Sequence, residues 1–158
     1  MFKHILVAID GSENSRRALP TAIECARKFG SDVFVLHVSE HDRGRAVIYS
    51  LETPAEATML VGDAVKTVNE AGISAKGAVH DAAVGHAAKN IVEAAALVGA
   101  DLIVMGSRGL SDVQGILLGS VTHKTMQLAQ TAVLVVRGTV TVPETAKTKA
   151  LAGTFATA

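Results

Sequence analysis

Five short apolar runs, separated by segments with helical periodicity, restrict the fold of this 158-residue chain more than any other feature. The runs are apolar at successive positions, as expected of strands that helices cover on both faces of a parallel sheet. Strands are therefore predicted over residues 5–9, 33–38, 73–79, 101–105 and 132–136, and the third has the weakest pattern.

Helices are predicted over residues 16–29, 54–71, 84–98 and 119–129, where apolar side chains recur at helical spacing. Pro54 suits a first helical turn, and glycine follows three of these segments, as is common at helix ends. The alternation predicts one α/β domain: a doubly wound, Rossmann-like, five-stranded parallel sheet with helices on both faces. Ligands of such sheets bind beyond the carboxyl ends of the strands.

The composition argues against several classes of protein. Fifteen basic residues balance fifteen acidic ones, which disfavours capture of nucleic acid or of an anionic membrane as the main function. Cys25 is the only cysteine, so a reducing compartment is expected. No signal peptide and no apolar run of membrane-spanning length is present. The chain is therefore predicted to be cytoplasmic.

A glycine-rich segment joins the fourth strand to the fourth helix. Gly106 and Gly109 follow the strand, and nine residues later Gly119 and Ser120 open the helix. Glycine allows the backbone to approach a ligand closely. The start of a helix presents unpaired N–H groups and the positive end of the helix dipole, a combination that suits phosphate. The segment therefore predicts a nucleotide site, although ordinary loop turns would also use glycine.

Two common nucleotide motifs are absent from the sequence. The chain has no Gly-Lys dipeptide, which the P-loop requires, and Gly11 is the only glycine after the first strand, where the dinucleotide fingerprint needs three. P-loop phosphoryl transfer and hydride transfer to NAD are therefore disfavoured.

The spacing G-x2-G-x9-G-[ST], with Ile-Val-Met before it and Val-Leu-Val-Val-Arg after it, resembles the universal stress protein family. The turn Asp10-Gly11-Ser12 and the strand end His37-Val38 fit as well, and the resemblance covers about residues 1–137. It implies the strand order 3-2-1-4-5. It also implies an adenine nucleotide, ATP or else ADP or AMP, between the first and fourth strands, with Mg²⁺ or Mn²⁺ brought by its phosphates.

The resemblance also implies a role for each site residue. The backbone of Val38 would contact adenine, and Asp10 would face the ribose or the metal-hydrated phosphates. The ribose and phosphate path would be lined by Met105, Gly106 and Gly109. The phosphates would be held by Gly119, Ser120 and Val121. The residues by themselves support only this last group and the closeness of Gly106.

Several of these residues have alternative interpretations. Asp10 could form a turn or cap a helix, and Ser12 is a second candidate cap. Arg108 could clamp a phosphate or simply face solvent. The six histidines show no metal-ligand spacing, and no catalytic arrangement can be argued from the spacing of the residues.

The last strand suggests a protein partner. In the family's strand order, Val133–Val136 form an apolar sheet edge, which pairing with a second copy would cover. A homodimer is therefore expected, unless the Thr- and Ala-rich tail over residues 138–158, predicted to be flexible, folds over that edge.

Three functions are compatible with the sequence. The first is a stress-response regulator that changes conformation or protein partner with its nucleotide and hydrolyses ATP slowly or not at all. The second is an ATP-consuming enzyme of similar fold, which would need a second substrate pocket. The third is a nucleotide-free dimeric adaptor, which the intact glycine motif disfavours.

Overall fold

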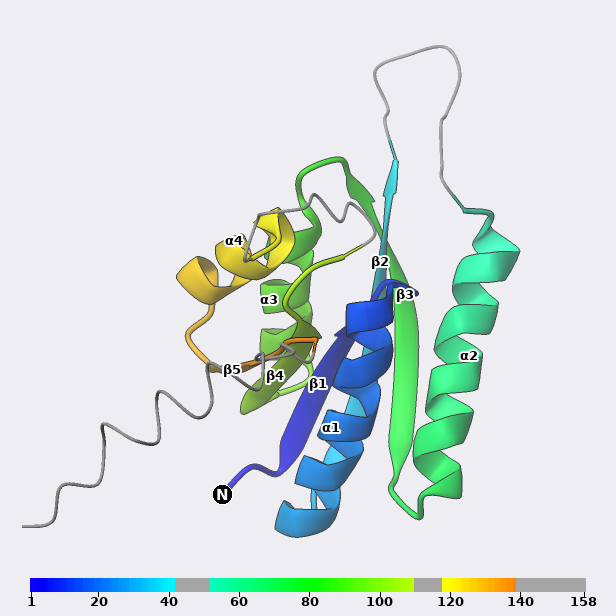
Figure 1. The fold of residues 1–158 in the computed structure, drawn as a ribbon, viewed down its shortest axis with the longest axis vertical. Helices are drawn as coiled ribbons and strands as arrows, with labels where there is room; N and C mark the ends of the chain where they lie inside the picture. Colours follow the sequence, from blue (N-terminus) through cyan, green and yellow to red (C-terminus); the bar gives the residue numbers. More distant parts are fainter. Residues whose placement is uncertain (42–51, 110–117, 139–158) are drawn as a thin grey trace, which may run out of the picture.

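The structure is a computed structural model that describes residues 1–41, 52–109 and 118–138. Strands and helices alternate along the described chain (Figure 1). The strands are β1 (His4–Ile9), β2 (Asp32–His41), β3 (Ala75–Ala83), β4 (Leu102–Gly106) and β5 (Ala132–Val136). The helices are α1 (Glu13–Phe29), α2 (Pro54–Glu70), α3 (Ala87–Leu97) and α4 (Ser120–Leu128).

The strands form one parallel sheet in the order β3-β2-β1-β4-β5. This confirms the predicted doubly wound fold and its strand order. The order reverses between β1 and β4, where the register pairs Ile5 with Leu102 and Ala8 with Met105. The carboxyl ends of these two strands therefore lie side by side.

Alternate residues of the strands enter two separate cores. On one face, Val7 of β1 and Val104 of β4 pack with α1 and α2. On the other face, Leu6 and Ile103 pack with Ile91 of α3. Figure 1 shows α1 and α2 along one side of the sheet, with α3 and α4 on the other. Burial on both faces explains why the central strands β1 and β4 are apolar at nearly every position.

Two predicted helix starts were wrong. Helix α1 begins at Glu13, three residues before the predicted start, because the Ser12 hydroxyl caps it by accepting the Ser15 N–H at 3.2 Å. Helix α3 begins at Ala87 and not at residue 84, because Glu40 of β2 accepts the N–H groups of Gly85 and Ala87 at 2.8 and 2.9 Å. That carboxylate comes from a distant part of the chain, so the local pattern could not reveal it.

Two predicted strands were too short or shifted. Strand β2 continues to His41, into the segment 39–52 that was interpreted as a connection. Strand β3 covers Ala75–Ala83 and not residues 73–79. The two strands pair as far as His41 with Ala83. Because β3 is an edge strand, most of its side chains are not buried, so polar residues such as His80 and Asp81 occur within it.

Parts of the sequence predictions fall outside the described residues. These parts are residues 42–51 of the second connection, residues 110–117 within the glycine motif, and residues 139–158 of the predicted tail. Of the helices within the described ranges, none is both long and apolar enough to cross a bilayer.

The contact between α2 and β3 requires Gly77. A methyl group at Gly77 would lie 2.6 Å from Cγ1 of Val61, 2.8 Å from Cγ2 of Val65 and 3.0 Å from the Val35 carbonyl. We expect Gly77→Ala to lower the free energy of unfolding by about 1–3 kcal/mol, measured by urea denaturation.

Gly62 provides the matched control. It lies within α2, is exposed, and has no atom within 4 Å of the position of a methyl group. Gly62→Ala should raise the free energy of unfolding by up to about 1 kcal/mol, because alanine favours helix. Equal effects of the two substitutions would contradict close packing at Gly77.

Candidate functional site

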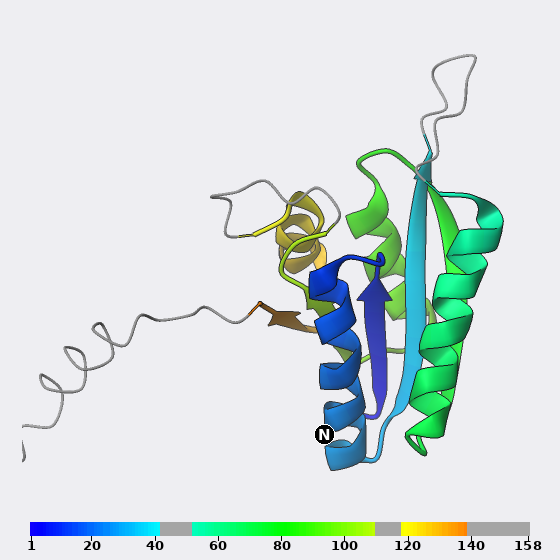
Figure 2. The same cartoon turned by 45° about the vertical axis from the view of Figure 1, so that its right-hand side comes forward.

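A cavity of about 350 Å³ lies at the carboxyl ends of β1 and β4, where the strand order reverses. Figure 2 shows the end of β1 and the start of α4 at the same end of the molecule. The structure brings all nine residues predicted from the sequence into the wall of this cavity: Asp10, Val38, Met105, Gly106, Arg108, Gly109, Gly119, Ser120 and Val121. Their contact with a ligand remains a prediction.

The motif glycines are required for packing within the chain. None of Gly106, Gly109 and Gly119 has a positive φ, so none is needed for a left-handed turn. A methyl group at Gly106 would lie 2.8 Å from the backbone carbon of Asn14 in α1, and one at Gly109 would meet the Asp10 carboxylate. The glycines therefore allow α1 and the β1 loop to approach the end of β4 and shape the cavity wall.

The first turn of α4 is fastened to the end of β4. The Gly119 N–H donates to the Ser107 carbonyl at 2.8 Å, and the Thr122 hydroxyl donates to the Gly106 carbonyl at 2.8 Å. The first N–H that bonds within the helix is that of His123, to Gly119 at 2.9 Å. The preceding N–H groups of Ser120 and Val121 therefore have no partner within the helix, and they lie at the cavity.

The start of α4 differs chemically from the other helix starts. Ser12 caps α1, Thr53 caps α2, and the Glu40 carboxylate accepts N–H groups at the start of α3. The N-cap of α4 is Gly119, which has no side chain, and the first turn contains no acidic residue. The positive end of the α4 dipole therefore faces the cavity, where it favours an anion.

Both interpretations of Asp10 have structural support. Its carboxylate accepts the Ser12 N–H at 3.0 Å, which forms the turn after β1, and the same side chain lines the cavity. Ser12 is buried, caps α1 and is not among the residues of the cavity wall. The alternative interpretation of Ser12 as a cap is therefore the one that the structure supports.

The charges in the cavity wall are unevenly distributed. Among the described residues that line it, Arg108 is the only arginine or lysine, and the carboxylates are Asp10, Glu40 and Glu52. Within the described ranges, no group of three His, Cys, Asp or Glu residues could hold a metal ion.

Sequence reasoning missed three ionisable residues of the wall, namely His37, Glu40 and Glu52, as well as the hydroxyl residues Ser15 and Thr122. His37 was noted only as part of a strand end, and Glu40 and Glu52 fell within the supposed connection. The pattern Thr53-Pro54-Ala55-Glu56 is a helix capping box and could have marked where that connection ends. In this box, hydrogen bonds from the backbone and hydroxyl of Thr53 lower the pKa of Glu56.

Solved structures share this architecture. The universal stress protein UspA from Lactobacillus plantarum aligns with a TM-score of 0.71 over 85% of this chain and 97% of its own, at 21% identity. A universal stress protein from Archaeoglobus fulgidus, solved in complex with dAMP, aligns with a TM-score of 0.66 over 85% of this chain and 97% of its own. That protein is 27% identical to this one.

The sequence comparisons agree with the structural ones. Universal stress protein YxiE from Bacillus subtilis (strain 168) is 33% identical over 151 residues, which cover 87% of this chain and all of that protein. The pattern that defines the Universal stress protein family matches residues 1–137. Together with the five-stranded fold, these matches show that the chain belongs to the universal stress protein family.

Proposed function

We propose that the cavity binds an adenine nucleotide, ATP in the first place, and that the protein is a cytoplasmic stress-response regulator. Nucleotide state would change its conformation or its choice of a protein partner. One observation supports this proposal most strongly: the glycines after β4 and the start of α4 converge on a single cavity. An anion can be bound there by backbone N–H groups.

The two ends of the cavity suit the two ends of a nucleotide. The start of α4, with Ser120 and Val121, would bind the phosphates. The apolar wall that includes Leu36, Val38 and Ile91 would contact the base. Asp10 lies in the wall at the end of β1, and its carboxylate would accept hydrogen bonds from the ribose hydroxyls.

A metal ion would arrive with the nucleotide. Mg²⁺ usually keeps several waters and binds through phosphates together with one or two carboxylates. Asp10 is the carboxylate that would face such a hydrated ion, and Mn²⁺ would bind in the same way. The residues in the wall thus fit a metal that is held mainly by its nucleotide.

The A. fulgidus relative supports this choice of ligand. It has the same fold, is 27% identical and was solved with dAMP. We carry the adenine over to this chain because the cavity residues include the full glycine motif. The proposal of a triphosphate goes beyond this relative, because dAMP has a single phosphate.

The second candidate, an ATP-consuming enzyme, has less support. The next cavity of the described chain, about 400 Å³, is lined by residues such as His4 and Asp32, at the amino ends of β1 and β2. It therefore lies at the opposite edge of the sheet from the nucleotide cavity and cannot place an acceptor beside the phosphates. No lysine lines the nucleotide cavity within the described ranges. Turnover of ATP should accordingly be slow or absent.

The third candidate, a nucleotide-free adaptor, predicts the same dimer as the first candidate. Strand β5 is a sheet edge, and Val133–Val136 are only partly buried. Met126 and Leu128 of the neighbouring helix α4 are exposed by 49% and 52%. We propose that a second copy covers this edge, which would hold for a regulator and for an adaptor alike.

Nucleotide released from the purified, denatured protein identifies the ligand by chromatography and mass. We expect adenine nucleotide on the wild type. Ser120→Ala should weaken ATP binding about tenfold or more, since a hydrogen bond to a charged group contributes about 1.5–3 kcal/mol. Gly119→Val should abolish binding, because its Cβ would lie 3.3 Å from Cα of Arg108 and its methyl groups need further space.

Gly62→Val is the matched control for Gly119→Val, because Gly62 is exposed on α2 and no atom lies within 4 Å of the position of its Cβ. It should bind ATP like the wild type in calorimetry. A wild type that ignores added ATP and Mg²⁺ would favour the adaptor, and rapid turnover with any acceptor would favour the enzyme.

Disruption of the β5 edge tests the dimer. We expect Val135→Lys to sediment as a monomer while the wild type sediments as a dimer, because a charge on a strand edge opposes pairing. Val84→Lys is the control, since Val84 is 63% exposed and lies outside β5. Dimers of unchanged stability in Val135→Lys would place the interface elsewhere.

A further inference from the structure

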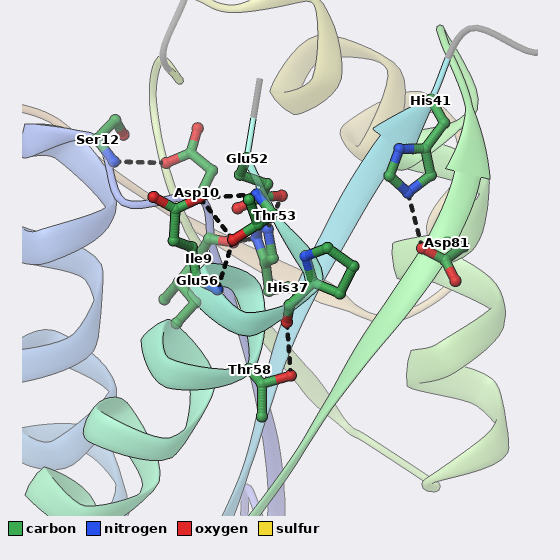
Figure 3. Close-up of polar contacts among 11 residues, drawn as sticks. Ile9, Asp10, Ser12, His37, His41, Glu52, Thr53, Glu56, Thr58 and Asp81 are labelled. Atoms are coloured by element: carbon green, nitrogen blue, oxygen red, sulfur yellow. Dashed lines mark hydrogen bonds and ion pairs between the residues drawn. The ribbon is translucent and has the colours of Figure 1, made fainter. Parts of the chain in front are cut away.

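A buried histidine in the cavity wall has no part in the proposed binding of phosphate or base. His37 lies on β2 and is 3% exposed. Its Nδ1 is 2.8 Å from the Ile9 carbonyl oxygen of β1, and its Nε2 is 2.6 Å from Oε1 of Glu52 (Figure 3). The imidazole therefore joins the end of β1 to the residue that precedes the α2 cap.

The hydrogen-bond partners determine where the protons of this pair lie. A carbonyl oxygen only accepts, so Nδ1 of His37 must carry a hydrogen and donate it to Ile9. Nε2 and the carboxyl oxygen of Glu52 could both be acceptors, and at 2.6 Å one proton must lie between them. His37 and Glu52 thus share one proton, and its loss would set a lone pair against a carboxylate.

The two ends of this tether lead directly to the cavity. Ile9 precedes Asp10, whose carboxylate accepts the Ser12 N–H at 3.0 Å. Glu52 precedes Thr53, the N-cap of α2. Ile9, Asp10, His37 and Glu52 all line the cavity. A change at the shared proton would therefore alter the wall on two sides at once.

We propose that His37 and Glu52 are a positioning pair for the nucleotide, and that their shared proton strengthens the binding of anionic nucleotides. The inference rests on the proposed function, because it assumes that the cavity takes a nucleotide. With the proton present, the pair has no net charge. Without it, the pair is negative beside Asp10 and Glu40, and a polyphosphate would be repelled.

Three further charged side chains lie near the pair, on β2, on α2 and after β4. Glu40 of β2 accepts two N–H groups at the start of α3, and Glu56 of α2 is bonded to Thr53. The pKa of Glu56 is lowered by those bonds, so it stays charged above acidic pH. From the β4 side, Arg108 lines the cavity. A change of ATP binding near neutral pH that Glu52→Gln abolishes would thus be assigned to the pair, because the ionisation of the nucleotide's own phosphate is the same for both proteins.

The structure contains a matched control pair. Nε2 of His41 is 2.9 Å from Oδ1 of Asp81, across β2 and β3. Figure 3 shows this second histidine–carboxylate pair further along β2, and neither residue lines the cavity. Asp81→Asn therefore removes the same chemistry from a place where it should not affect the nucleotide.

Calorimetry from about pH 5 to about pH 9, an interval that contains the ordinary charge change of a histidine side chain, tests the proposal with ATP, AMP and adenosine. In the wild type and in Asp81→Asn, ATP affinity should fall about tenfold with rising pH, AMP affinity less, and adenosine affinity least. Glu52→Gln should bind ATP as the wild type does at low pH and show no fall. Its amide N–H can donate to Nε2 of His37, which keeps the tether without a titrating proton.

Glu52→Ala should bind every ligand more weakly at each pH, since it lacks the tether. If this variant unfolds, Glu52→Gln still decides. A wild type that binds ATP, together with a Glu52→Gln variant that keeps the wild-type pH profile, would overturn the positioning pair alone. A wild type that binds no adenine nucleotide at any pH would overturn the proposed function and, with it, this inference.

Nitrogen NMR of the His37 ring in the ligand-free protein gives an independent readout. Nδ1 should remain protonated over the whole range, while Nε2 changes state in the wild type and accepts a constant hydrogen bond in Glu52→Gln. A ring whose Nδ1 loses its proton, or whose Nε2 titrates alike in both proteins, would overturn the shared proton whatever the ligand binding shows.

Discussion

The parallel pairing of β1 with β4 is the contact on which the rest of the structure depends. These strands are adjacent in the sheet, and the strand order reverses between them. In the sequence, 92 residues lie between the end of β1 at Ile9 and the start of β4 at Leu102, so the pairing closes a long loop of the chain. The loop after each strand must turn to an opposite face, which leaves a space at their carboxyl ends. The cavity occupies this space, so the topology itself creates the site.

Close packing then shapes that space. Gly106 lets α1 approach β4, and Gly109 leaves room for the Asp10 carboxylate. Two hydrogen bonds, from Gly119 and Thr122, fix the start of α4 to the same strand end. The glycine motif therefore has a structural reason that is independent of any ligand, and the same packing points the helix start at the cavity.

Hydrogen bonds within the chain fix the acidic groups of the cavity wall in place. Glu40 accepts N–H groups at the start of α3, Asp10 accepts one from Ser12, and Glu52 shares a proton with His37. The first turn of α4 contains no acidic residue. The positive end of the α4 dipole is therefore not opposed by a carboxylate of its own first turn.

The sequence by itself predicted the α/β fold class and the glycine-rich wall of the cavity, because both depend on local patterns. Apolar runs require burial on both faces, and the spacing from Gly106 to Ser120 lies within one connection. Only the tertiary structure revealed the hydrogen-bond partners of Glu40 and Glu52. Glu40 can fix the start of α3 at Ala87 only because β2 and α3 are adjacent in the fold. Glu52 can contact His37 only because α2 packs back over β2. Such contacts join side chains from separate elements, and no periodicity along the chain encodes them.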